Sequence, residues 1–141
     1  MIRKAELSDL RALADLALKL WPGHDREELT GELREVLDRE DAAFFLAEGN
    51  GGFAQCQLRQ DYVEGTDSSP VGYLEGIYVD DSHRRQGIAR ELLSACECWA
   101  KEQGCREFAS DCELTNTQSL EFHLALGFEE ANRIICFTKK L

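Results

Sequence analysis

One stretch of the sequence constrains the fold more than any other. Residues 71 to 80 read Val-Gly-Tyr-Leu-Glu-Gly-Ile-Tyr-Val-Asp, a run rich in β-branched and aromatic residues that predicts a strand. A basic, glycine-containing loop follows at residues 81 to 87. The next apolar residues recur at helical spacing and predict one buried helix face: Ile88, Leu92, Leu93, Cys96 and Trp99. The chain therefore contains a strand, a loop and a helix that packs on the sheet.

The first turn of that helix predicts a binding site for an anion. Backbone N–H groups there have no partner within the helix, and the helix dipole is positive at that end. Gly87 and Ala89 keep the approach free of bulky side chains, while Arg84 and Arg85 add charge that pairs with phosphate. The alternative is a solvated basic turn that caps an ordinary helix.

The motif Arg84-x-x-Gly87-x-Ala89 after an apolar strand resembles the pyrophosphate-binding motif of the GNAT acetyltransferases, Gln/Arg-x-x-Gly-x-Gly/Ala. The resemblance implies acetyl-CoA as the cosubstrate. It also implies that one backbone N–H among residues 77 to 79 stabilises the oxyanion. The coenzyme site that it implies is Ile77, Tyr78, Val79, Arg84, Arg85, Gln86, Gly87, Ile88, Ala89 and Arg90.

The order of predicted elements extends this resemblance over the whole chain. The 141 residues, 43% of them hydrophobic, predict one domain spanning residues 1–141. The fold class is α/β, a GNAT fold whose mixed central sheet has splayed fourth and fifth strands and flanking helices. Strands are expected at 2–6, 42–48, 53–62, 71–80, 106–112 and 133–139, and helices from a cap at Ser8 to Leu20, at 25–38, from 88 to Gly104 and at 116–126.

Two further features fit the GNAT pattern. In that family an Asn at the start of the last helix binds the pantetheine arm, and a Gly-Phe pair ends the helix; Asn116 and Gly127-Phe128 match. Asn116 is also an ordinary helix N-cap residue, and both roles are compatible. Gly76 lies where the family has a bulge that splays two parallel strands.

Four segments resemble the aminoglycoside 6'-N-acetyltransferases in particular: 20–24, 61–71, 74–79 and 104–111. The resemblance implies that Glu75 and Asp111 bind the aminoglycoside, with Glu75 as the candidate base. Trp21, His24 and Tyr62 would line the substrate cleft. Without the resemblance, these three residues would be a core plug, a turn residue and a strand end.

Acetyl transfer to an amine requires a base, an oxyanion site and a proton for the leaving thiolate. Many GNAT enzymes place a tyrosine acid four residues before the glycine that closes the last helix, and here that position is His123. His123 is therefore either the catalytic acid or a satisfied core residue. Asn132 stands where some relatives have an acidic residue that touches substrate, which puts the substrate range in question.

Charge narrows the partners. The chain has 27 acidic and 16 basic residues and a net charge of −11, which repels nucleic acid and anionic lipid and attracts small cations, although many proteins are acidic for solubility alone. We expect no nucleic acid or membrane partner, and a homodimer by analogy with relatives. The N-terminus lacks the apolar core of a secretion signal, which favours a cytoplasmic location.

The six cysteines do not follow the spacing of a disulfide framework or a zinc site, and only three histidines are present. We therefore expect reduced, mostly buried thiols and no metal.

Three functions remain open at this stage. The first is acetylation of the 6'-amine of aminoglycosides, with antibiotic resistance as its consequence. The second is acetylation of another cationic amine, such as a polyamine or a peptide N-terminus. The third is a non-catalytic acetyl-CoA-binding sensor, against which Glu75 and Asp111 argue.

Overall fold

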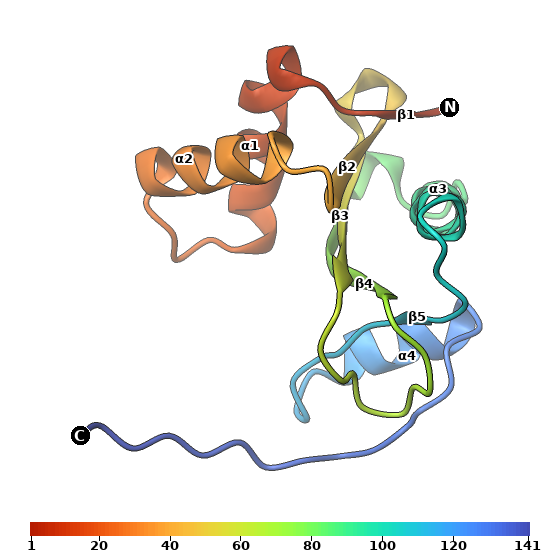
Figure 1. Ribbon diagram of the computed structural model, residues 1–141. Coiled ribbons are helices and arrows are strands. Elements are labelled where there is room, and N and C mark those ends of the chain that lie inside the picture. The colour runs from red at the N-terminus through yellow and green to blue at the C-terminus, as the bar shows by residue number, and fades with distance from the viewer.

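The computed structural model describes residues 1–141 and contains a five-stranded sheet with helices on both faces (Figure 1). The strands are β1 (Ile2–Lys4), β2 (Ala42–Ala47), β3 (Gly52–Arg59), β4 (Val71–Val79) and β5 (Phe108–Ala109). The helices are α1 (Leu10–Leu20), α2 (Arg26–Leu37), α3 (Ile88–Glu102) and α4 (Thr117–Ala125). Short 3₁₀ turns occupy Leu7–Asp9, Glu48–Asn50 and Asp81–His83.

The sheet is mixed, as predicted. Its strands follow the chain order β1-β2-β3-β4-β5; the first four pair antiparallel, and β4 pairs parallel with β5. The β4 to β5 pairing covers only Gly72 and Tyr73 of β4, so the rest of that edge, from Leu74 to Val79, has no strand beside it. The two strands are therefore splayed, and they leave an opening at the end of β4.

Helices cover the sheet in two layers (Figure 1). On one face α1 and α2 bury a core cluster with Leu13, Phe44 and Phe53. On the other face α3 packs against Phe45 and Ala54. Neighbouring residues of β2 thus point to opposite faces, as the two-residue period of a strand requires. Both clusters are apolar, so the sheet that carries the site has a packed layer on each side.

The helix ends follow the predicted capping in part. Asp25 caps α2, because its side chain accepts a hydrogen bond of 3.1 Å from the backbone N–H of Glu28. The predicted cap at Ser8 is wrong. A capping box between Glu6 and Asp9 starts that segment instead, and Arg3 binds the Asp9 carboxylate at 2.7 Å.

Two predicted strands differ in the structure. The strand expected at 106–112 shortens to Phe108–Ala109, where its pairing with β4 ends; the side chains of Ser110 and Asp111 beyond it bind His123 and Tyr73. The strand expected at 133–139 is absent: the segment runs along one end of the molecule as an extended tail (Figure 1). A strand needs a hydrogen-bonded neighbour, and this segment has none within the chain. Its apolar side chains Ile134, Ile135 and Phe137 are 66% to 87% exposed.

The six thiols are all free, but only half of them are buried. Cys56, Cys96 and Cys105 lie in the core, whereas the other three are exposed, so the expectation of mostly buried cysteines is wrong for Cys98, Cys112 and Cys136. The error has a simple origin, because two of the exposed thiols belong to the regions predicted as strands that do not form. None of the helices combines the length and the apolar character that a bilayer crossing demands.

Candidate active site

A β-bulge in β4 brings a carboxylate to the face of the sheet that α1 and α2 cover. Gln55 of β3 faces Gly76, and Cys56 faces Leu74, so Glu75 is the extra residue between them. Glu75 and Gly76 consequently lie on the same side of the sheet, toward Trp21. The irregularity predicted near Gly76 is confirmed, and its effect is to aim Glu75.

Glu75 lines a pocket of about 250 Å³ between α2 and the sheet. Trp21 and His24, both predicted for the substrate cleft, line the same pocket from the turn between α1 and α2. The Trp21 ring packs edge-on against Phe53 of the core at 6.3 Å between ring centroids, and the centroid of the His24 ring also lies 6.3 Å from that of Trp21. The core therefore fixes the indole that forms one wall of the pocket.

Sequence reasoning missed two polar residues of this pocket, Glu32 and Gln55. A signal for Glu32 was present: it lies three residues after Leu29 and four before Val36, on the stripe of α2 that faces the sheet. With Glu75, it places two carboxylates in one small pocket. Such a pair attracts a ligand that carries more than one positive charge.

Glu75 has a cationic partner within the chain. One terminal nitrogen of Arg59 lies 3.1 Å from each carboxylate oxygen, and Arg59 Nε lies 3.3 Å from Oε2. Burial raises the pKa of Glu75 above its usual value, and the charge and hydrogen bonds of Arg59 oppose that rise. The net effect is upward, so the carboxylate is a better proton acceptor than an exposed glutamate.

Asp111 connects to this group through Tyr73. The Tyr73 hydroxyl donates a hydrogen bond to Asp111, and the Arg59 guanidinium lies 3.4 Å above the centre of the Tyr73 ring. Burial, together with Asp111, raises the pKa of Tyr73, which keeps its hydroxyl a donor. Asp111 lies in the loop after β5, not on a strand as expected, and it does not line the pocket.

The loop before α3 has the backbone expected for an anion site. Gly87 is the N-cap of α3 with φ of 79°, and no side chain caps the first turn. A Cβ at Gly87 would meet nothing within 4 Å, so the approach to the first-turn N–H groups is open. Arg85 also has a positive φ, 64°. Ile88 and Ala89 form the first turn, and Gln86 lies in the loop before it.

Two arginines of the predicted coenzyme site are engaged by the protein. Arg84 donates to the carbonyl of Val79 at 3.0 Å and binds Asp81 at 2.8 Å, below the end of β4. Arg90 donates to the carbonyl of Ala125 at 3.2 Å, at the end of α4. The Arg84 contact ties the loop to the end of β4, the strand that contains Ile77 and Tyr78. The Arg90 contact ties the first turn of α3 to the last helix.

The last helix holds Asn116 and His123. The Asn116 side chain caps α4 by accepting from the N–H of Ser119 at 3.1 Å. His123 Nδ1 lies 2.7 Å from the Ser119 carbonyl, and Nε2 lies 2.8 Å from the Ser110 hydroxyl. Since a carbonyl only accepts, Nδ1 carries a proton, and in the neutral ring Nε2 accepts from Ser110. The His123 ring also packs on Phe128 at 5.1 Å.

Tyr62 and Asn132 lie outside the pocket. Tyr62 is 75% exposed, and its hydroxyl accepts from the Gly65 N–H at 3.3 Å. Asn132 donates to Glu64 at 2.8 Å. Both therefore belong to the loop between β3 and β4 and to the segment that packs on it, so the structure does not bring them together with Trp21 and His24.

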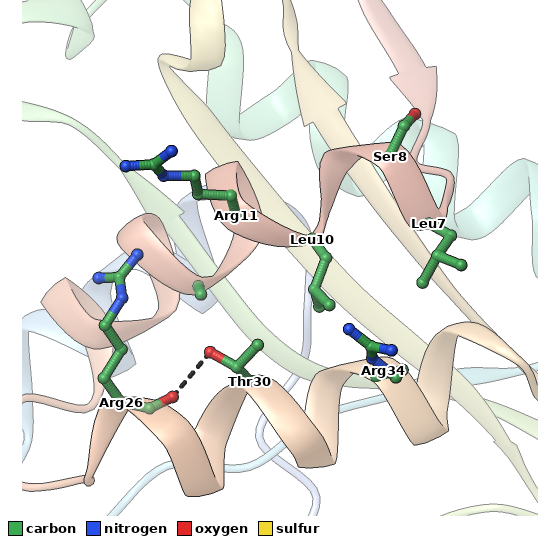
Figure 2. A pocket seen from close by; sticks show the side chains of 8 residues that line it. Leu7, Ser8, Leu10, Arg11, Arg26, Thr30 and Arg34 are labelled. Carbon is green, nitrogen blue, oxygen red and sulfur yellow. Dashed lines mark hydrogen bonds between the residues drawn. The ribbon is translucent and has the colours of Figure 1, made fainter.

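A second cavity, of about 400 Å³, lies between α1 and α2 (Figure 2). Three arginines and no carboxylate line it: Arg11, Arg26 and Arg34. Figure 2 shows their guanidinium groups around an apolar floor that includes Leu10. Arg26 is paired with Asp15, whereas Arg11 and Arg34 have no carboxylate in the lining, which distinguishes this cavity from the pocket of Glu75.

Comparison with known proteins agrees with this geometry. The model of the acetyltransferase (GNAT) family matches residues 10–128. An aminoglycoside N(6')-acetyltransferase type 1 of Salmonella enteritidis is 42% identical over 99% of this chain and 98% of its own. The enzyme of the same name from Stenotrophomonas maltophilia is 45% identical over 99% of this chain and 93% of its own.

Two solved structures are also similar to this chain over its whole length. AAC(6')-Iy in complex with the bisubstrate analogue CoA-S-monomethyl-acetylneamine superposes with a TM-score of 0.94 at 42% identity, covering 100% of this chain and 98% of that one. AAC(6')-IG from Acinetobacter haemolyticus, without ligand, gives 0.95 at 38% identity, covering 100% and 99%. The chain belongs to the acetyltransferase (GNAT) family, among its aminoglycoside 6'-N-acetyltransferases.

Proposed function

We propose that this chain transfers the acetyl group of acetyl-CoA to the 6'-amine of aminoglycoside antibiotics and so confers resistance. The observation that carries the proposal is Glu75, which a bulge directs into a pocket with Trp21 and a second carboxylate, beside the opening between β4 and β5. Relatives named aminoglycoside N(6')-acetyltransferase type 1, which are 38% to 45% identical over most of the chain, support it.

Acetyl-CoA would enter along the loop before α3. The open first turn at Gly87 suits the pyrophosphate, with Arg85, Gln86 and Ala89 around it. The pantetheine arm would lie in the splayed opening next to β4, with Asn116 at its far side. A backbone N–H among residues 77 to 79, on the edge without a strand partner, would stabilise the oxyanion.

Glu75 would accept the proton of the attacking ammonium group, directly or through one water. An alkylamine is almost wholly protonated at neutral pH, so the carboxylate must first hold the ammonium and then remove its proton. The raised pKa of Glu75 supports this role. His123 would return a proton to the thiolate of CoA, for which Nε2 must first become protonated; in that state Nε2 donates to the Ser110 hydroxyl, which can accept as well as donate.

The polycationic sugar would lie between two walls. Trp21 offers flat apolar surface to a sugar ring, and Glu32 offers a carboxylate to a second ammonium. Asp111 would bind a further amine near the opening, and His24, which lines the pocket, would contact a hydroxyl or amino group. The net charge of −11 favours the approach of such a ligand.

We also propose that the enzyme is a homodimer. Ile134, Ile135 and Phe137 expose most of their surface on a tail that has no partner within the chain. A second copy that covered them would remove this apolar surface from water. A cytoplasmic location follows from the cosubstrate, because acetyl-CoA is produced and used there.

The decisive experiment measures thiol release from acetyl-CoA with a panel of aminoglycosides, polyamines and short peptides. We expect turnover with aminoglycosides and a product that NMR identifies as acetylated at the 6'-amine. Turnover confined to polyamines or peptides would overturn the substrate, and coenzyme binding without any thiol release would identify a sensor.

A further inference from the structure

Arg59 binds the carboxylate that a substrate cation would have to reach. Its guanidinium contacts both oxygens of Glu75 at 3.1 Å and stacks 3.4 Å above the Tyr73 ring. Asp111 binds the hydroxyl of the same tyrosine. One arginine therefore links the two carboxylates that the sequence predicts for substrate binding, and it leaves neither oxygen of Glu75 without a cationic neighbour.

The fold builds this contact. Arg59 ends β3 opposite Val71, so Tyr73 lies diagonally across the pair of strands, within reach of a long side chain. Glu75, two residues after Tyr73, lies on the same side of the strand, just before the register shift of the bulge. Glu75 is the only carboxylate that Arg59 contacts, whereas the nearby Arg39 is bound to Asp41 at 2.8 Å. The Glu75 side chain is only 20% exposed.

We propose that Arg59 is a positioning residue for Glu75, an inference that rests on the function proposed above. In the empty site Arg59 keeps Glu75 ionised and oriented. When a substrate ammonium arrives, Arg59 releases the carboxylate to it. The exchange is one cation for another at the same two oxygens. Arg59 stays anchored over Tyr73 by its stacking contact, so only the charged tip has to move. No group is oxidised or transferred in this step.

The groups around Glu75 carry charges of both signs. Asp111 and Tyr73 lie on one side, Arg39 adds a second positive charge, and Glu32 and His24 line the pocket in front. Burial favours the neutral carboxyl, and Arg59 opposes it. Without an internal cation, the empty site would retain a proton on Glu75 over a wider pH range, and the base would start in the wrong state.

Two consequences of removing Arg59 can be separated. At a pH where Glu75 is ionised both with and without Arg59, the loss of a competing cation lowers the KM for the aminoglycoside, by about three- to tenfold for a partly exposed pair. At acid pH the loss of the positive charge and of the hydrogen bonds of Arg59 raises the pKa of Glu75 further. The acid limb of kcat/KM then moves to higher pH by the same amount.

The experiment compares Arg59→Met with Arg39→Met, which removes an arginine from the same neighbourhood without touching Glu75. We expect the lower KM in Arg59→Met only, and a larger shift of the acid limb in Arg59→Met than in Arg39→Met, because Arg39 acts on Glu75 by its charge alone. Arg59→Lys keeps the charge but loses the forked guanidinium, so it should give an intermediate result. Circular dichroism and the thermal midpoint verify folding of each variant. A KM that rises in Arg59→Met, or an acid limb that Arg39→Met moves equally, would overturn the role.

A readout independent of turnover separates this proposal from the function on which it rests. The carboxyl carbon of Glu75, followed by NMR in the free enzyme, should titrate at a higher pH in Arg59→Met than in the unmodified chain. An unchanged titration defeats the role of Arg59 even if aminoglycosides are acetylated. Absence of turnover in the unmodified chain defeats the proposed function, while the titration still decides whether Arg59 holds Glu75.

Discussion

Trp21 and Gly76 lie in direct contact across the candidate pocket. A Cβ added to Gly76 would lie 2.8 Å from the indole atoms Cη2 and Cζ2, closer than carbon atoms approach in proteins. Because Trp21 also packs against Phe53 of the core, the indole has little room to retreat. The missing side chain at Gly76 therefore lets the indole lie directly against β4, next to Glu75.

Gly76→Ala tests this contact. We expect a loss of about 1–3 kcal/mol in the free energy of unfolding from overpacking, and a higher KM for the aminoglycoside because the indole must shift. Gly31→Ala is the control: it lies in α2 with nothing within 4 Å of the new Cβ, and alanine there stabilises by about 0.5–1 kcal/mol. Equal stability and KM in Gly76→Ala and the unmodified chain would show that Trp21 is mobile.

Glu75→Gln tests the base. Amide nitrogen and oxygen keep the shape of the side chain but cannot take a proton, so we expect turnover to fall by about a hundredfold or more while the Kd for acetyl-CoA stays the same. Turnover and calorimetry measure the two quantities. Undiminished turnover would remove Glu75 from this role.

The pH profile gives a second reading of Glu75. Its pKa is raised in the folded protein. As the pH falls, Glu75 therefore takes up a proton, and stops acting as a base, at a higher pH than an exposed glutamate does. The acid limb of kcat/KM should therefore lie above the ordinary glutamate pKa of 4.5. A limb at or below that value would mean that another group is the base.

The sequence predicted most of the sheet and helices because their signals are local. Apolar periodicity identified α1, α2 and α3, and the Gly-Asn turn identified the β2 to β3 hairpin. The strand expected at 133–139 failed for a non-local reason: its alternation is real, but a strand forms only beside a partner, and periodicity does not reveal whether one exists.

The site was predicted less completely than the fold. Family motifs pointed to Glu75 and Trp21, which the structure places in one pocket. Arg59 was missed because its significance depends on the register of β3 against β4, which a sequence pattern does not encode, although the bulge near Gly76 was predicted. Tyr62 was placed in the cleft by resemblance alone, and in the structure it points to solvent.

Gly87→Glu tests the coenzyme loop. The new side chain adds bulk and negative charge beside the first-turn N–H groups, so we expect the Kd for acetyl-CoA to rise by at least about tenfold. Gly104→Glu is the matched control, because Gly104 also has a positive φ, 91°, and open surroundings but follows the opposite end of the same helix. Similar losses of coenzyme binding in both variants would attribute the effect to backbone strain.

Glu32→Gln tests the carboxylate that sequence reasoning missed. If Glu32 holds a second ammonium, its loss should raise the KM for aminoglycosides by about three- to tenfold and change kcat little, since the group acts in binding and not on the reacting atoms. Glu35→Gln removes the same charge from the exposed face of α2 and controls for long-range attraction. If the two substitutions have equal effects at low salt and both effects disappear at high salt, Glu32 acts only through the long-range electrostatic field of the protein.

Ile135→Asp tests the role of the C-terminal tail in a dimer. Light scattering of the unmodified chain should give about twice the monomer mass of 15.9 kDa. Aspartate at position 135, which is 80% exposed in the single chain, should shift the equilibrium toward monomer because a charge would be buried in the interface. Thr138→Asp adds the same charge in the same segment without removing apolar surface, and it should weaken the dimer less. A monomeric mass for the unmodified chain at assay concentration would contradict the dimer, and the tail would then have to be covered in another way.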